Sequence, residues 1–130
     1  MKKVCVLFSI VLLATACPMD SFEIIWVKNK SNETIVITGG YILPDTLLPQ
    51  IKPQRLVTIS VNESRMLADD AHDRHLTRMK NGERLTIFVL SKDSVDNHSW
   101  EYLRENNVIL KRYEFNWQEL QEMGGSVSFP

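Results

Sequence analysis

The sequence predicts a single small domain that is mainly β, on the border with the α+β class. Three observations support this fold class. Short runs rich in β-branched and aromatic residues recur along the chain, polar turn residues separate them, and the helical patterns are short. Because no long helix connects successive strands, the sheet should be mostly antiparallel. We therefore expect a compact, mostly antiparallel sheet or a small sandwich with two or three short helices.

Six segments have the composition of strands. They are residues 22–28, 34–38, 55–61, 84–90, 108–115 and 126–130. The polar residues 29–33 favour a hairpin with a long loop between the first two strands. Residues 41–53 contain three prolines, which exclude a central strand or a helix and indicate an extended surface connection whose apolar residues pack down. The most apolar segment, 84–90, should be the central strand.

Residues 69–81 form the first predicted helix. Asp69 and Asp70 lie near its start, Lys80 near its end, and Gly82 follows as a stop signal, an arrangement that suits the helix dipole. A long ordered loop is the alternative interpretation of this segment.

Two further helical segments follow. Residues 97–106 predict a second short helix, with Trp100 and Leu103 facing inward. A capped helical turn begins at Asn116, because a glutamate, Glu119, stands three residues after the asparagine.

The first residues are typical of an export signal. Lys2 and Lys3 precede an apolar run over 4–14, which is too short to cross a bilayer as a helix, since that takes about twenty residues. Small residues at 14–16 then lead to Cys17. An ordinary secretory signal with an incidental cysteine, or a retained membrane anchor, are the alternatives.

This order of apolar run, small residues and cysteine resembles the lipobox of bacterial lipoproteins. The leucine that usually stands three residues before the cysteine is replaced by Ala14, and Leu13 lies one place earlier. The resemblance implies cleavage before Cys17, a diacylglycerol on its thiol and an acyl chain such as palmitate on its new amino group. It implies a signal peptide over 1–16, a lipidated tether over 17–21 and one domain over 22–130. It places the domain in the cell envelope, anchored by lipid, at the outer membrane.

Composition narrows the partners and the chemistry. Without Lys2 and Lys3 the chain keeps 13 basic and 16 acidic residues, with no basic cluster, so a nucleic-acid partner is not expected. Cys5 leaves with the signal and Cys17 carries lipid, so neither cysteine remains for a disulfide, a nucleophile or a metal thiolate. No motif for a cofactor is present, and we expect none.

The mature region is similar to small uncharacterised lipoproteins of Bacteroides-type bacteria. The residues that carry the likeness are Asn29 to Ser31, Pro44-Asp45-Thr46, Ile87-Phe88 with Trp100, Lys111-Arg112-Tyr113 and Phe129-Pro130. This likeness of pattern covers most of the mature chain. It implies the location and the single domain, and it implies no site residue, because that family has no assigned activity.

Two short stretches match the O-glycosylation motif of exported proteins from such bacteria. They are Asp45-Thr46-Leu47 and Asp93-Ser94-Val95. The implied acceptors are Thr46 and Ser94, both of which we expect in exposed loops. Chance matches to a motif of three residues are frequent, so unmodified loops are the alternative.

His72 and His75 are the weak candidates for a metal site. Three residues apart, they would share one face of a helix, with Asp69 and Asp73 nearby. A lasting site needs three or four converging ligands, and His98 is the only other histidine. We therefore expect a solvated polar helix face and no bound metal.

A cluster of catalytic residue types occurs at 93–98, with an acid, a hydroxyl and an imidazole close in sequence. Catalytic triads join residues that are distant in sequence, and no Gly-x-Ser-x-Gly elbow is present. We expect a turn and a helix start at 93–98, and no catalytic residue in the chain.

Four large side chains leave a choice between packing and binding. Arg112 falls on an otherwise apolar strand face, which predicts a paired charge, with an anionic ligand as the sharper alternative. Trp26, Trp100 and Trp117 should pack in the core, and a platform for stacking sugar rings is the alternative.

These observations favour a non-enzymatic envelope lipoprotein whose domain contacts a partner protein or helps to hold an envelope assembly. A module that binds a glycan or a small ligand is the alternative, and a small hydrolase ranks lowest. Because a sugar platform needs an exposed aromatic ring, the exposure of the three tryptophans separates the first two hypotheses.

Overall fold

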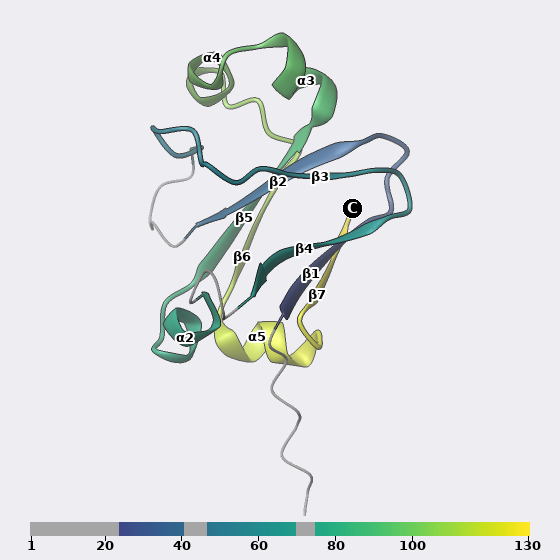
Figure 1. Cartoon of the computed structure of the whole chain (residues 1–130). Coiled ribbons are helices and arrows are strands. Elements are labelled where there is room, and N and C mark those ends of the chain that lie inside the picture. The colour runs from purple at the N-terminus through teal and green to yellow at the C-terminus, as the bar shows by residue number, and fades with distance from the viewer. Residues whose placement is uncertain (1–23, 41–46, 70–74) are drawn as a thin grey trace, which may run out of the picture.

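The computed structural model describes residues 24–40, 47–69 and 75–130 (Figure 1). In these ranges the chain forms seven strands and four short helices. The elements are β1 (Ile24–Asn29), β2 (Ile35–Gly40), β3 (Val57–Ile59), β4 (Ser64–Asp69), α2 (His75–Lys80), β5 (Leu85–Ser91), α3 (Lys92–Asn97), α4 (Trp100–Glu105), β6 (Lys111–Phe115), α5 (Trp117–Glu122) and β7 (Ser126–Phe129). No helix in these ranges is long and apolar enough to span a bilayer.

The strands form two sheets. One has three strands in the order β4-β1-β7, and the other has four in the order β3-β2-β5-β6. Every pair is antiparallel except β1 with β7, which is parallel. This arrangement confirms the prediction of a mainly β, mostly antiparallel fold with short helices.

The predicted hairpin between the first two strands is wrong. β1 pairs with β4 and β7, whereas β2 pairs with β3 and β5 in the other sheet. The turn at 30–34 therefore carries the chain between the sheets. Both strands still bury apolar residues, because they face each other across the core instead of lying side by side, and a hydrophobic pattern does not distinguish these two arrangements.

The two sheets pack face to face around the main core. This core takes residues from both sheets and from α2 and α5, and all of them are buried. They are Ile25, Val27, Ile35, Ile37, Ile59, Leu67, Met79, Leu85, Ile87, Val89, Leu120, Val127 and Phe129. The sandwich is thus held mainly by aliphatic packing.

A second, smaller core covers the outer face of the four-stranded sheet. Phe88 and Leu90 of β5 pack there against Leu48 and Leu103. All residues from Leu85 to Leu90 are buried, because alternate side chains enter the two cores. The predicted central position of this strand is confirmed, since β5 lies between β2 and β6.

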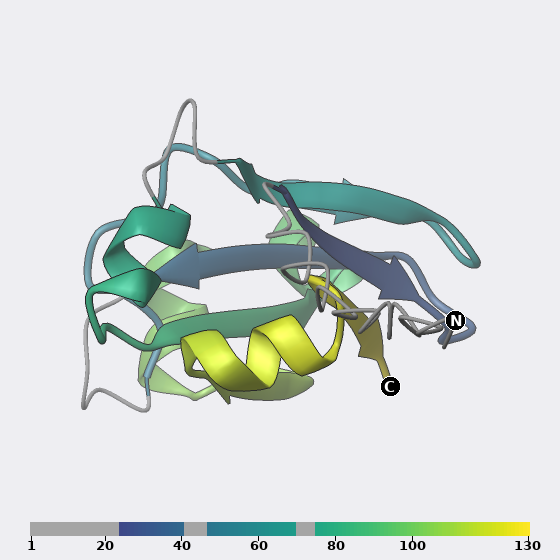
Figure 2. The same cartoon turned by 90° about the horizontal axis from the view of Figure 1, so that it is seen from below.

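Helices lie at both ends of the sandwich. Figure 1 shows α3 and α4 at one end and α2 and α5 at the opposite end, and Figure 2 views the molecule from the end with α2 and α5. The predicted cap of α5 is confirmed, because the Asn116 side chain accepts from the Glu119 N–H and the Glu119 carboxylate accepts from the Asn116 N–H.

Two predicted helices differ in extent from the helices of the structure. Only 75–80 of the predicted helix 69–81 is a described helix, since β4 runs to Asp69 and residues 70–74 lie outside the described ranges. The helix expected at 97–106 begins at Trp100, where the hydroxyl of Ser99 accepts a hydrogen bond from the Tyr102 N–H. Leu103 faces inward as expected and is buried, while Trp100 is half-buried.

Asn29, the last residue of β1, connects the two sheets through its buried side chain. Its Nδ2 donates to the carbonyl oxygens of Glu33 at 2.7 Å, Ile59 at 3.1 Å and Ser60 at 3.2 Å. Its Oδ1 accepts from the N–H and the hydroxyl of Ser31. One amide thereby fixes both turns at this end of the sandwich.

Candidate binding site

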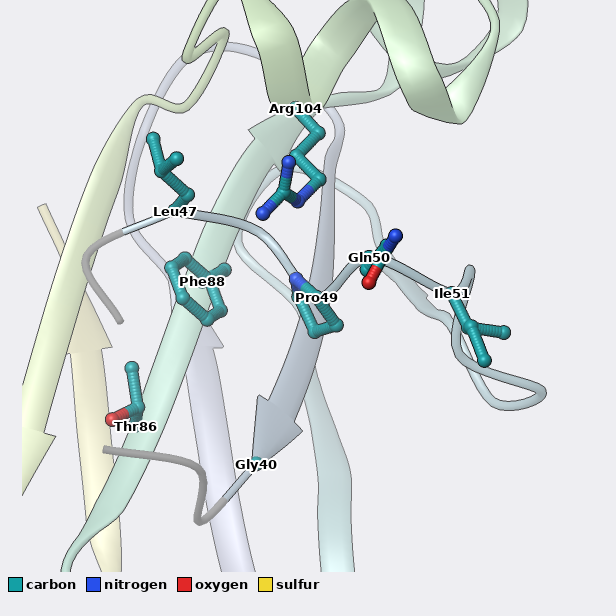
Figure 3. A pocket seen from close by; sticks show the side chains of 8 residues that line it. All are labelled: Gly40, Leu47, Pro49, Gln50, Ile51, Thr86, Phe88 and Arg104. Atoms are coloured by element: carbon teal, nitrogen blue, oxygen red, sulfur yellow. The ribbon is translucent and has the colours of Figure 1, made fainter. Parts of the chain in front are cut away.

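A pocket of about 430 Å³ opens on the outer face of the four-stranded sheet (Figure 3). Its described lining comes from the end of β2, the connection after it, the middle of β5 and the last turn of α4. These residues are Gly40, Leu47, Pro49, Gln50, Ile51, Thr86, Phe88 and Arg104. The volume lies within the range of about 300–1,000 Å³ that small-molecule sites occupy, and the lining is largely apolar, as in most such sites.

Helix α4 holds the wall of this pocket through two side chains. The Trp100 Nε1 donates to the carbonyl oxygen of Pro49 at 2.8 Å, and the Arg104 Nε donates to that of Leu48 at 3.0 Å. Trp100 and Arg104 stand one helical turn apart and so share a face of α4. The Leu48 side chain is fully buried in the second core. The wall is therefore anchored by packing and by hydrogen bonds to consecutive carbonyls.

The mouth and the floor of the pocket differ in character. Ile51 at the lip is 84% exposed, an unusual position for an isoleucine, whereas Phe88 on the floor is buried. Thr86 lies two residues before Phe88 on the floor and is 1% exposed, and its hydroxyl has no hydrogen-bond partner among the described residues. An apolar ligand would thus meet a mainly hydrocarbon floor, with the polar side chains of Gln50 and Arg104 elsewhere in the lining.

Gly40 keeps one side of the pocket open. Among the described residues, a Cβ built at this position meets no atom within 4 Å. The register pairs Gly40 with Thr86, so a side chain at position 40 would project from the pocket face of the sheet. Gly39 faces the other way, where a Cβ would meet Leu67 at 3.4 Å.

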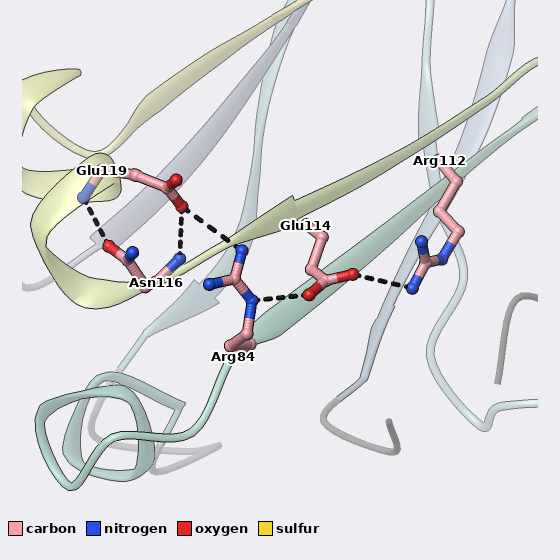
Figure 4. A network of polar contacts seen from close by, with 5 residues as sticks. All are labelled: Arg84, Arg112, Glu114, Asn116 and Glu119. Atoms are coloured by element: carbon pink, nitrogen blue, oxygen red, sulfur yellow. Dashed lines mark hydrogen bonds and ion pairs between the residues drawn. The ribbon is translucent and has the colours of Figure 1, made fainter. Parts of the chain in front are cut away.

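A network of charges lies on the same sheet face, beside the pocket (Figure 4). The Glu114 carboxylate accepts from the Arg84 Nε at 2.5 Å and from the Arg112 guanidinium at 2.9 Å. The hydrogen bond from Arg84 is the main reason that the pKa of Glu114 is lowered; the charge of Arg84 and the contact with Arg112 lower it further, against partial desolvation. Arg84 also approaches Glu119 of α5 at 3.7 Å. The paired charge predicted for Arg112 is confirmed.

Most of the predicted lipid, sugar and metal sites lie outside the described residues. This applies to Cys17, Thr46 and His72, and the side chain of His75 at the start of α2 is not described either. We expected Ser94 in an exposed loop, and this is wrong. Ser94 lies half-buried within α3, because the helix begins directly after β5 at Lys92. Over the described ranges, no group of three or more His, Cys, Asp or Glu residues is placed to hold a metal ion.

The catalytic residue types at 93–98 find other contacts. Lys92 pairs with Asp96, the Asn97 amide donates to Asp93, and the exposed His98 ring stacks on Tyr102 with centroids 4.4 Å apart. These contacts stabilise α3 and its junction with α4. The structure does not bring the acid, the hydroxyl and the imidazole together as a triad.

The tryptophans occupy three different environments. Trp117 packs against the main core with Lys80 over its ring, and Trp100 packs against the second core. Trp26 was expected in the core, and this is wrong: its side chain is 43% exposed on the outer face of the three-stranded sheet. That strand buries only alternate residues, so one of its faces is open.

Sequence reasoning did not find the pocket. The sequence features that border the pocket are Gly40 at the end of a strand and the prolines that follow it. These features predicted only a surface connection with buried apolar residues. Comparisons of the chain with models of protein families, with curated proteins and with solved structures give no match.

Proposed function

We propose that this chain is an envelope lipoprotein, tethered through Cys17, whose domain binds a small ligand with an apolar body and catalyses no reaction. The pocket over β5 is the observation that carries the proposal. It combines a ligand-sized volume, a largely apolar lining and a wall held by α4. The tether follows from the signal pattern before Cys17.

The shape of the pocket supports a small ligand over a long polymer. Phe88 forms the floor, the residues 47–51 form a wall, and Ile51 extends the apolar surface to the mouth. Burial of apolar surface contributes about 25 cal/mol per Å², so a short aliphatic or aromatic body gains affinity from this lining. Trp100 and Trp117 are half-buried, the exposed Trp26 lies on the other sheet, and no tryptophan is among the described residues that line the pocket.

A contact with a partner protein is the second candidate, and Trp26 favours it. Its ring lies on the outer face of the three-stranded sheet, opposite Met66 in the register and beside Ser126. Tryptophan is among the residues that contribute most at protein interfaces. This face is separate from the pocket, so the two candidates need not exclude each other.

Photolabelling of the full chain in membranes tests the pocket directly. The probe is a decanol that carries a diazirine, a neutral aliphatic molecule, and digestion with mass spectrometry maps the labelled residues. We expect label on residues 47–51 and 86–88. Gly40→Leu should fill the pocket and reduce this label about tenfold, whereas the control Gly40→Ala adds only a Cβ and should keep most of it.

Thermal unfolding tests whether the Gly40→Leu variant still folds. Among the described residues, position 40 has open space for a Cβ, and a strand gains about 0.5–1 kcal/mol when glycine is replaced by alanine. Gly40→Leu should therefore retain the unfolding temperature of the natural chain. Label spread evenly along the chain, or equal label at the pocket of a folded Gly40→Leu variant, contradicts the proposed function.

A further inference from the structure

We infer that the outer face of the three-stranded sheet rests on the membrane surface, with the Trp26 ring among the lipid headgroups. This inference rests on the tether of the proposed function and not on the pocket, which lies on the other sheet. It starts from an exposed aromatic ring that the fold places close to the tether.

The outer face of the three-stranded sheet is open at its centre. Trp26 lies on the central strand, β1, and its side chain is exposed, whereas the next residue, Val27, points into the core and is fully buried. The register places Met66 of β4 on one side of Trp26 and Ser126 of β7 on the other. Because serine is small, the ring has no large neighbour in the sheet on that side.

This ring lies at the end of the sandwich where β1 begins. The Gly125 carbonyl accepts from the Trp26 N–H at 2.8 Å, and the Met123 carbonyl accepts from the Ser126 N–H at 3.2 Å. The end of α5, with the exposed Met123, is therefore next to the start of β1. Ile24, the first residue of β1, is the point where the tether joins the described domain.

The tether keeps this end of the domain close to the bilayer. Ile24 follows Cys17 by seven positions, so their Cα atoms are at most about 25 Å apart in any conformation. A domain of this size has a diameter of about 30–35 Å, from its expected radius of gyration. A lipid on Cys17 therefore holds the start of β1 within less than one domain diameter of the membrane surface.

The chemistry of the face suits a lipid surface. Tryptophan is enriched at the boundary of membrane and water, because its ring is apolar and its N–H is polar. Lys28 is exposed on the same face, and its long stem allows the ammonium group to reach lipid phosphates. The residues that the register places beside these two carry no negative charge; they are Ser64, Met66, Ser126 and Ser128.

The tether also favours lipid over a partner protein as the occupant of this face. One exposed ring does not hold a domain on a membrane, since even a single acyl chain binds only marginally. A short tether makes the second contact intramolecular, with an effective concentration in the millimolar range. The contact of Trp26 therefore depends on the lipid at Cys17, which brings a bilayer, and no protein, to this face.

Photolabelling from the lipid tests this contact. The natural chain is purified from membranes in detergent and reconstituted in vesicles of phosphatidylcholine and phosphatidylglycerol in equal parts, with a diazirine near the headgroup end of some acyl chains. We expect label on residues 24–28, 64–66 and 123–126. Tyr102 and Leu110 are 45% and 42% exposed, like Trp26 at 43%, so contact in random orientations predicts equal label at all three. We expect about fivefold less at Tyr102, because α4 lies at the opposite end of the sandwich from α5.

Fluorescence quenching gives a second readout in the same vesicles. Lipids with bromine near the headgroup end of the acyl chain replace the diazirine lipids and quench the tryptophans that they touch. Trp26→Phe should reduce the quenched part of the emission about fivefold, because Trp100 and Trp117 pack against the two cores.

A charge on the face should break the contact without removing the tether. Trp26→Glu should reduce lipid label on residues 64–66 and 123–126 about tenfold, because a carboxylate is expelled from the interface toward water. The matched control, Tyr102→Glu, places the same charge at a similarly exposed position and should leave this label unchanged. Thermal unfolding checks that both variants fold, and the quenching of Trp26→Phe does not depend on them.

The outcomes separate this inference from the proposed function. Absence of lipid mass at Cys17 contradicts the tether, and the contact falls with it. With lipid at Cys17, equal label at Tyr102, or quenching that Trp26→Phe leaves unchanged, overturns the contact while the tether stands. A Trp26 that is shielded from iodide in native membranes but not reached by bromolipids in vesicles overturns it too, in favour of a partner protein.

Discussion

The indole N–H of Trp100 donates to the carbonyl oxygen of Pro49 at 2.8 Å, and so joins positions 51 residues apart in the sequence. Proline has no N–H, so its carbonyl is the one backbone group through which α4 can hold this point of the wall. The contact ties the shape of the pocket to the position of a helix that follows the central strand.

Trp100→Phe keeps most of the ring and removes this hydrogen bond. We expect a loss of about 1 kcal/mol in the free energy of unfolding and a weaker label at the pocket, because the wall is less firmly held. Urea unfolding measures the first effect and the diazirine decanol the second. Trp26→Phe is the matched control, because Trp26 is exposed on the other sheet and should change neither quantity. Equal effects of the two substitutions would mean that the Pro49 contact stabilises nothing.

Asn29→Ala should destabilise the domain strongly. The substitution leaves the carbonyls of Glu33 and Ile59 and the groups of Ser31 without their buried partner, at about 2–3 kcal/mol in the free energy of unfolding. Asn32→Ala, at an exposed position of the same turn, should stay within about 0.5 kcal/mol of the natural chain. Chemical denaturation of both variants measures the difference. A small effect at position 29 would show that the amide is dispensable for joining the sheets.

Because of Glu114, the stability of the domain should decrease as the pH becomes acidic. The pKa of Glu114 is lowered in the folded chain, chiefly by the hydrogen bond from Arg84. The ionised Glu114 therefore stabilises the fold, and this stabilisation is fully present above the ordinary pKa of 4.5. That contribution is lost as the pH falls through the lower folded value. Glu114→Gln should be less stable at neutral pH and lose less stability on acidification from pH 5. Unfolding midpoints over this range, with a carboxyl NMR titration of Glu114, check both statements; a Glu114 pKa at or above 4.5 contradicts them.

Cys17→Ser should release the protein from the membrane fraction without unfolding it. The hydroxyl cannot form the thioether to diacylglycerol that the lipobox pattern implies. Fractionation and mass spectrometry of the N-terminal peptide give the readout, with Cys5→Ser as the control that leaves attachment intact. If the natural chain carries no added lipid mass at Cys17, the tether is not formed there.

Local signals were sufficient for many elements and insufficient for their pairing. The run Leu85–Leu90 was recognisable as a central strand because it is apolar on both faces, and the cap at Asn116 because capping depends on residues three apart. β4 was missed, since the sequence from Ser64 contains no β-branched residue and the strand gains its order from pairing with β1. The partners of β1 are distant in sequence, and a pattern of alternation does not identify them.

The pocket was beyond prediction for the same reason. Its floor, its wall and its upper rim come from β5, from residues 47–51 and from α4, and only packing brings these together. The burial of apolar residues in the proline-containing connection was foreseen; it is confirmed for Leu48 and wrong for Ile51, which is exposed at the mouth of the pocket. The register of β5 with β2 and β6 places Thr86 on the floor of the pocket, where its hydroxyl has no partner in the described part of the chain, and the sequence does not reveal this register.

The parallel pairing of β1 with β7 makes neighbours of the earliest and the latest strands of the described chain. Synthesis from the amino end makes β1 first and β7 last of the described strands. The three-stranded sheet therefore cannot be completed until β7 has been made, and until then β1 lacks one of its two neighbours. The order of pairing couples completion of this sheet to synthesis of the last described strand.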